Sequence, residues 1–177
     1  VLDNYFRNHW QGEMSKYKYS GPALIDEINN LKPRRVLDIG CGYHEFKGKI
    51  DNIVGIDPYN SAADYEVKLL DYNPTEKFDA TLALGSINFG STDKIFAELE
   101  HAVKLCNPGA VMFFRANPGL PHDETDRPDS KNHSKWIYFY PWDSNFIVNC
   151  ADQLGVDILD IRTDSFRNRL YFVWRTK

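Results

Sequence analysis

The sequence predicts an α/β protein, a three-layer sandwich in which helices cover a mostly parallel, seven-stranded sheet. Three observations favour this fold class. Short, almost continuously apolar runs bounded by Gly, Pro, Asn or Asp recur along the chain, which is typical of strands covered on both faces. Amphipathic helical stretches lie between several of these runs. Near the end of the chain, a short polar turn separates two strand-like runs, which indicates an antiparallel hairpin.

The predicted strands share a length of five to seven residues and a nearly continuous apolar character. They are Val36–Gly40, Ile53–Asp57, Tyr65–Leu70, Phe78–Leu84, Ala110–Ala116, Val156–Arg162 and Arg169–Arg175. The last two form the predicted hairpin, so we expect the final strand to run against its neighbours while the others run parallel.

Three stretches have the apolar periodicity of helices. Thr92–Leu105 places its apolar residues on one face, and Ser91 or Thr92 is expected to cap its start. Pro22–Leu31 carries a single apolar stripe. A third helix is expected to open at Pro141 and to reach Leu154, with Gly155 as its stop.

The connection between the first two predicted strands is short. Only the segment YHEFKGKIDN separates Gly42 from Ile53. Two parallel neighbours are usually joined by about a dozen residues or more, mostly helical. We therefore expect the first helix of the fold to be reduced to one or two turns, or to be absent.

The chain of 177 residues suits a single domain, 1–177. Residues 1–31 are expected to form an N-terminal helical extension. Its aromatic residues, Tyr5, Phe6, Trp10, Tyr17 and Tyr19, either pack as a helix face or cap a pocket. The charged, proline-bearing stretch 118–136 is either a solvated loop or a lid over a substrate.

Composition and charge exclude some classes of protein. The net charge of −4 argues against non-specific binding to nucleic acid, and no apolar run is long enough to span a bilayer. The three cysteines, Cys41, Cys106 and Cys150, are widely spaced and form no zinc pattern. They predict reduced thiols in a cytoplasmic protein without a bound metal.

Two acidic residues end or interrupt neighbouring predicted strands. Asp38 precedes the glycines of DIGCG, and Asp57 follows about 20 residues later, near the spacing of dinucleotide-binding proteins. Ligands of parallel α/β sheets bind at the carboxyl ends of the strands, where a carboxylate can accept both hydroxyls of a ribose. The third glycine of the dinucleotide pattern is missing, because Glu45 stands there. A nucleoside without phosphates therefore fits better than NAD.

Five motifs in order then resemble those of the class I S-adenosylmethionine (SAM)-dependent methyltransferases. They are VLDIGCG, IVGIDPY, LLDYNP, FDATLALGSINFG and NPGAVMFF. With the terminal hairpin, the resemblance covers roughly residues 30 to 177. It implies a Rossmann-like methyltransferase fold with SAM as cofactor and methyl transfer as the reaction.

The resemblance also implies which residues contact SAM. They are Asp38, Gly40, Cys41 and Gly42 at the methionine end, Asp57 at the ribose, Pro58, Tyr59, Asp71 and Tyr72 around the adenine, and Leu84, Gly85 and Ser86 at the sulfonium side. Taken alone, Asp57 and Asp71 could equally be turn residues, and Cys41 a small residue in a tight turn. His44 departs from the family pattern, because it stands in place of the third glycine of GxGxG.

Contacts with the methyl acceptor are harder to assign. Asn88 and Asn117 follow the fourth and fifth predicted strands, and His122 lies in the 118–136 stretch. Each is either an acceptor contact or an ordinary turn or loop residue. No residue is assigned as a catalytic base, since transfer from a sulfonium needs one only when the acceptor must lose a proton.

The sequence favours a small-molecule acceptor over nucleic acid. It lacks the [DN]PP[YF] element and the Pro-Cys nucleophile of the DNA-base methyltransferases that the family contains. Two other interpretations stay open. One is a non-catalytic SAM-binding or scaffold protein, which the short first connection suggests. The other is an NAD-dependent oxidoreductase, against which the missing third glycine argues.

Overall fold

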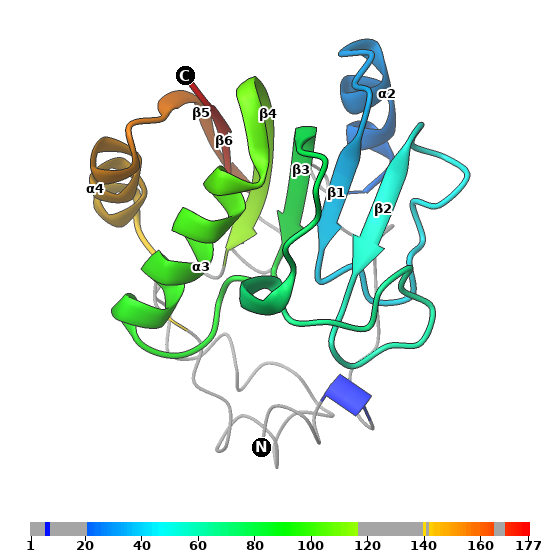
Figure 1. The fold of residues 1–177 in the computed structure, drawn as a ribbon. Coiled ribbons are helices and arrows are strands. Elements are labelled where there is room, and N and C mark those ends of the chain that lie inside the picture. Colours follow the sequence, from blue (N-terminus) through cyan, green and yellow to red (C-terminus); the bar gives the residue numbers. More distant parts are fainter. Residues whose placement is uncertain (1–5, 8–20, 117–139, 141, 165–168) are drawn as a thin grey trace.

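The computed structural model describes residues 6–7, 21–116, 140, 142–164 and 169–177. Within them, six strands form one sheet in the order β2-β1-β3-β4-β6-β5 (Figure 1). The strands are β1 (Val36–Ile39), β2 (Ile53–Ile56), β3 (Phe78–Leu84), β4 (Cys106–Ala116), β5 (Asp157–Asp164) and β6 (Arg169–Arg175). The first four run parallel, and β6 is antiparallel to both β4 and β5. The predicted C-terminal hairpin with a reversed final strand is therefore confirmed.

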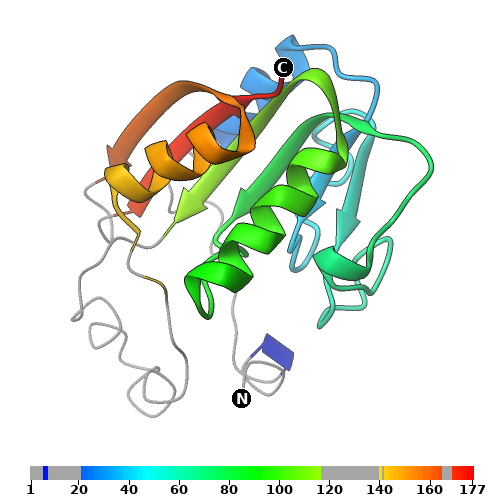
Figure 2. The ribbon, with the colours of Figure 1, turned by 60° about the vertical axis from the view of Figure 1, so that its left-hand side comes forward.

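Helices cover both faces of the sheet, as predicted. They are α2 (Pro22–Asn30), α3 (Thr92–Lys104) and α4 (Ser144–Leu154). Figure 2 shows α3 lying over β3 and β4, and α4 over the β5–β6 hairpin. Apolar residues of α3 and α4 belong to one core cluster, and those of α2 to a second cluster behind β1 and β3. Because β-strand side chains alternate between faces, the buried strands contribute to both clusters.

The helix ends follow local capping chemistry. Ser91 Oγ accepts a hydrogen bond from the backbone N–H of Lys94, which starts α3 as expected. The Asp143 side chain accepts from the N–H of Phe146 at 2.8 Å, so α4 starts at Ser144 rather than at Pro141, which lies outside the described residues. Gly155 ends α4 in the left-handed conformation, with a φ of 69°.

The predicted strand Tyr65–Leu70 is not a strand of the sheet. One isolated parallel bridge joins Ile56 to Tyr65, and Leu69–Asp71 then forms the 3-10 helix η2. The outer edge of β2 is already occupied, because Gly55 N–H donates to the Asp64 side chain while Gly55 C=O accepts from the N–H groups of Asp64 and Tyr65. With that edge filled, the described residues form six strands rather than seven.

The connection between β1 and β2, residues 41–52, contains hydrogen-bonded turns and no helix, as its length predicts. Two of its apolar residues, Phe46 and Ile50, belong to the buried cluster that also contains Leu24 and Ile28 of α2. These side chains cover the face of β1 that a longer crossover helix would cover. A parallel pair of strands can therefore be closed by so short a connection.

Several predicted segments cannot be compared with the structure. The 118–136 stretch and most of the N-terminal extension, 1–5 and 8–20, lie outside the described residues. Asn117 and His122 lie outside them as well. Within the part of the chain that is described, no helix has the length and apolar character needed to cross a membrane.

Candidate functional site

The order in which successive strands are added to the sheet reverses at β1. From β1 the chain passes to β2 on one side and, later, to β3 on the other. In open α/β sheets this switch in strand order is where ligands bind, at the carboxyl ends of the strands. The loops that follow β1, β2 and β3 carry most of the residues predicted to contact a cofactor. Contacts between side chains and backbone groups join these loops.

Gly40 and Ser86 bring the loops after β1 and β3 together. Gly40 has a φ of +69°, and a Cβ placed on it would lie 2.3 Å from Ser86 Cβ. Ser86 Oγ donates a hydrogen bond to Ile39 C=O at 2.6 Å. Any side chain at position 40 would collide with this contact, so the glycine is required by a close approach as well as by its backbone conformation.

Asp57 brings the loops after β1 and β2 together. Its Oδ2 accepts from Gly42 N–H at 3.0 Å, and its Oδ1 accepts from Tyr59 N–H at 2.7 Å. The residue is only 9% exposed. Burial raises the pKa of Asp57, although the N–H groups of Tyr59, Gly42 and Asn60 partly offset this effect. Asp57 is therefore a buried, oriented carboxylate and not a solvated turn residue.

Asp38 is the second buried acid of this site. It is only 4% exposed. Burial, followed by the nearby charge of Asp57, raises the pKa of Asp38 to about 7. Two neighbouring buried acids form a site that a positively charged ligand group would stabilise.

The residues predicted to surround an adenine are only partly together. Pro58 and Tyr59 are half-buried in the loop after β2, next to Asp57. Asp71 ends η2 with an exposed side chain. The ring of Tyr72 is buried, and it packs against Phe78 with ring centroids 6.4 Å apart. Tyr72 thus belongs to the core cluster beside α3.

The loop after β3 contains the residues predicted for the sulfonium side. Leu84 C=O accepts from Arg115 Nη2 at 2.8 Å, and Gly85 has a φ of +91°. Asn88 is buried. Its side-chain N–H donates to Gly85 C=O at 3.1 Å, and its backbone C=O accepts from Tyr140 N–H at 2.7 Å. Asn88 therefore braces this loop and joins it to the segment that precedes α4.

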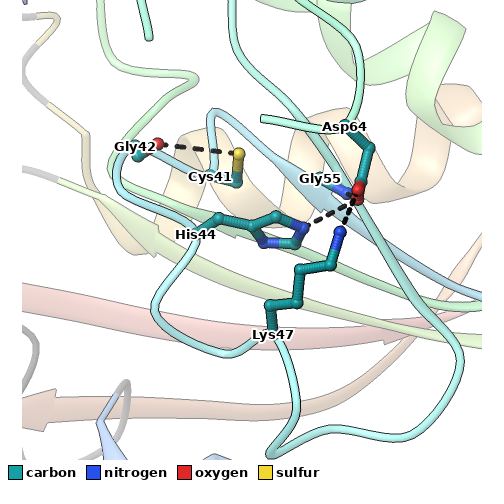
Figure 3. Close-up of polar contacts among 6 residues, drawn as sticks. All are labelled: Cys41, Gly42, His44, Lys47, Gly55 and Asp64. Carbon is teal, nitrogen blue, oxygen red and sulfur yellow. Dashed lines mark hydrogen bonds and ion pairs between the residues drawn. The ribbon is translucent and has the colours of Figure 1, made fainter. Parts of the chain in front are cut away.

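A polar cluster beside β2 was missed by sequence reasoning (Figure 3). His44, with a φ of 56° and a buried side chain, places Nε2 2.7 Å from Asp64 Oδ2. Asp64 also contacts Lys47 Nζ, and it accepts from Gly55 N–H at 2.8 Å. Burial raises the pKa of Asp64, but the hydrogen bonds from Lys47, Gly55 and His44 outweigh it and lower this pKa to about 2.

This cluster explains why a histidine can replace the third glycine of the motif. A Cβ on Gly55 would lie 2.7 Å from His44 Cε1 and 2.8 Å from Cys41 Sγ, so both side chains pack on the bare backbone of β2. His44 thereby ties the β1–β2 connection to the sheet edge. Its place in the motif was the one signal available; nothing in the sequence pattern singles out Asp64.

The cysteines behave as packed thiols. All three are free. Burial and then the charges of Asp38, Asp57 and Asp64 raise the pKa of Cys41 far above its ordinary value. A thiol that resists ionisation is a poor nucleophile, so the small-residue interpretation of Cys41 is favoured. Among the described residues, no group of three or more His, Cys, Asp or Glu side chains is arranged to hold a metal ion.

Comparisons by sequence find no relatives: no protein-family model matches the chain, and no curated protein matches it. Structural comparison finds methyltransferases. The N-methyltransferase NodS of Bradyrhizobium japonicum, bound to S-adenosylhomocysteine (SAH), matches with a TM-score of 0.70 at 11% identity, over 99% of this chain and 96% of NodS.

Two further solved structures match over nearly their whole length. Magnesium protoporphyrin IX methyltransferase (ChlM) of Synechocystis, bound to SAM, has a TM-score of 0.69 at 11% identity, over 99% of this chain and 95% of ChlM. A SAM-dependent methyltransferase of Clostridium acetobutylicum has a TM-score of 0.66 at 13% identity, over 99% of this chain and 96% of the other. The chain therefore has the fold of the class I SAM-dependent methyltransferases.

Proposed function

We propose that this protein binds SAM at the carboxyl ends of β1, β2 and β3 and transfers its methyl group to a small-molecule acceptor. The observation that supports this most directly is the pair of buried acids, Asp38 and Asp57, the second of which is hydrogen-bonded to Gly42 in the glycine loop after β1. SAM carries a sulfonium, an ammonium and a ribose diol, which are the groups that such a site would stabilise. The class I fold supports the same assignment.

The chain's own residues would act mainly by positioning. When bound, SAM supplies a methyl group that its positive sulfur already activates for in-line displacement. Asp57 would hold the ribose hydroxyls, Asp38 would face the charged methionine end, and Ser86 would stand beside the sulfonium. Correct alignment of two reactants supplies a large share of the rate in such transfers. A proton acceptor is needed only for an acceptor that must lose a proton.

The acceptor does not follow from the structural matches, because NodS is named as an N-methyltransferase and ChlM as a magnesium protoporphyrin IX methyltransferase. We propose a small molecule, since the net charge of −4 disfavours a nucleic-acid backbone. The three free thiols support a reducing, cytoplasmic setting.

A non-catalytic SAM-binding protein is the second candidate. It is motivated by the β1–β2 connection, which has no helix and carries His44 where the motif has glycine. The same connection argues against a dinucleotide cofactor, because no helix N-terminus stands behind Gly42 to bind a pyrophosphate. Turnover separates the two SAM-binding candidates: only an enzyme forms SAH when SAM is incubated with a panel of metabolites.

Thermal shift with SAM, SAH, NAD and NADP tests the proposal. A ligand present at 100 times its Kd stabilises the native state by about 2.7 kcal/mol, which corresponds to a rise of about 5–10 °C in melting temperature. We expect this rise with SAM and SAH, its loss in Asp57→Ala, and its retention in Asp152→Ala, an exposed acid on α4. A rise with NAD or NADP alone would refute the proposal in favour of an oxidoreductase.

A further inference from the structure

The described N-terminal residues, Phe6 and Arg7, lie at the end of the sheet where the parallel strands terminate (Figures 1 and 2). The sequence left open whether the N-terminal aromatic residues pack as a helix face or cap a pocket. For Phe6, two ring contacts support the second alternative, because they reach two of the three loops that form the candidate site.

Phe6 joins the loop after β2 to the loop after β3. Its ring stacks on that of Tyr59 with centroids 5.2 Å apart and planes inclined by 6°, and it meets Phe89 edge-on at 5.3 Å. Since β1 lies between β2 and β3 in the sheet, the glycine loop after β1 lies between the loops that Phe6 connects. Phe6 thus links the two loops that lie on either side of the glycine loop.

Arg7 holds this arrangement from the outside. Its Nη2 donates to Pro58 C=O at 3.2 Å, and its Nη1 pairs with Glu66 at 3.4 Å. The guanidinium carbon also lies 5.8 Å from the centroid of the Tyr59 ring. Both charged side chains are about half exposed, so the ion pair adds little stability. The contacts of Arg7 with Pro58 and Tyr59 nevertheless hold residues 6 and 7 against the loop that also carries Asp57.

Tyr59 connects the aromatic contact to the buried acid. Its backbone N–H donates to Asp57 Oδ1, while its ring stacks on Phe6. Phe6 and the Asp57 carboxylate therefore contact the same residue, Phe6 through its ring and Asp57 through its backbone N–H. With the hydrogen bond from Arg7 to Pro58 C=O, this places residues 6 and 7 against the loop that carries the buried acid.

We propose that Phe6 and Tyr59 form an aromatic roof over the nucleoside end of the site, in which Phe6 is a positioning residue for the cofactor. This inference rests on the proposed function and adds a binding residue to it. The alternative is that the Phe6 ring, stacked on Tyr59, occupies the position of the nucleobase and competes with the ligand. The two arrangements differ in the sign of the effect when Phe6 is removed.

Calorimetric titration with SAH on the full chain tests the roof. An aromatic contact that the roof makes only with the bound nucleobase would contribute about 0.5–1.5 kcal/mol. Phe6→Ala should therefore raise the Kd for SAH about three- to tenfold, mainly through faster dissociation. Phe6→Tyr, which keeps the ring, should bind like the wild type. Leu154→Ala removes a partly buried side chain from the last turn of α4, and it should lower the melting temperature without changing the Kd.

A double-mutant cycle makes the assignment specific. If Phe6 acts through Tyr59, Phe6→Ala should have no further effect on the Kd in a Tyr59→Ala background. Unchanged or tighter SAH binding by Phe6→Ala, or effects that simply add to those of Tyr59→Ala, would overturn the roof while leaving the proposed function intact. Failure of the wild type to bind SAH would overturn the proposed function, and this inference with it.

Discussion

The carboxylate of Asp57 accepts a hydrogen bond from the backbone N–H of Gly42 at 3.0 Å, so the protein's own groups join the loops after β2 and β1. The acid proposed to hold a ribose is therefore also part of the scaffold. A substitution at this position acts on both roles, and variants must be chosen to separate them.

Asp57→Asn separates binding from scaffolding. The amide keeps one oxygen to accept from Gly42 N–H but loses the second acceptor and the charge. Since hydrogen bonds to charged groups contribute about 1.5–3 kcal/mol, we expect the Kd for SAH to rise about 10- to 100-fold. The melting temperature should change far less than in Asp57→Ala. Wild-type affinity in a calorimetric titration of Asp57→Asn would show that this carboxylate does not hold the ligand.

Asp38→Asn should stabilise the protein without ligand at alkaline pH. The pKa of Asp38 is raised from an ordinary 3.8 to about 7, so its ionisation disfavours the folded state as pH rises from about 4 through 7. The amide removes this cost. We expect a gain of roughly 1–3 kcal/mol at pH 8, or about 3–10 °C in melting temperature, and little gain at pH 4.5.

The measurement for Asp38→Asn is a series of thermal melts from pH 4.5 to 8.5. The melting temperature of the variant should change less with pH than that of the wild type. Its affinity for SAM should fall, because the variant no longer offers a carboxylate to the cationic methionine end. A variant that is less stable than the wild type at pH 8 would contradict the assignment of Asp38 as a strained, buried acid.

Gly40→Ala should be more damaging than Gly109→Ala. Both glycines have positive φ, 69° and 79°, so both substitutions carry the left-handed penalty of about 1–2 kcal/mol. Only at position 40 does the new Cβ meet another atom, Ser86 Cβ at 2.3 Å, while nothing lies within 4 Å at position 109. Urea unfolding should show the extra loss, and Ser86→Gly should restore part of it in the double variant.

His44→Ala should cost more stability than Lys47→Ala, although both side chains contact Asp64. His44 is 2% exposed at its side chain and Lys47 is 60% exposed. A buried hydrogen-bonded ring lost from a packed site costs about 1–3 kcal/mol, whereas an exposed ion pair contributes about 0–1 kcal/mol. Urea unfolding at pH 7 compares the two, and equal losses would show that the cluster is held by charge alone.

The variants His44→Ala and Lys47→Ala should also differ from the wild type in the pH at which they unfold in acid. Because the folded-state pKa of Asp64 is lowered to about 2, its contribution to stability is present above about pH 4 and is lost as pH falls towards 2. Removal of either donor should let the pKa of Asp64 rise towards its ordinary value. Acid unfolding of His44→Ala should therefore begin at a higher pH than that of the wild type.

Much of the fold could be predicted because it depends on local patterns and chain connectivity. The apolar runs of β1 to β4, the periodicity of α3 and the terminal hairpin each identify an element from its own residues. The position of Asp57 also follows from sequence, since a parallel strand must deliver its last residue to the carboxyl edge of the sheet. The ten-residue connection predicted that the first helix would be reduced to one or two turns or be absent, and the structure has turns and no helix there.

The tertiary structure alone decided how the edge of β2 is completed and what surrounds the site. Tyr65–Leu70 has the composition of a strand, but composition cannot tell that Asp64 already occupies the N–H of Gly55. Nor can it tell that His44 packs against that glycine, or that Phe6 stacks on Tyr59 from more than fifty residues away. Such contacts depend on which backbone and side-chain groups folding brings together, and residue patterns along the chain carry no record of those distances.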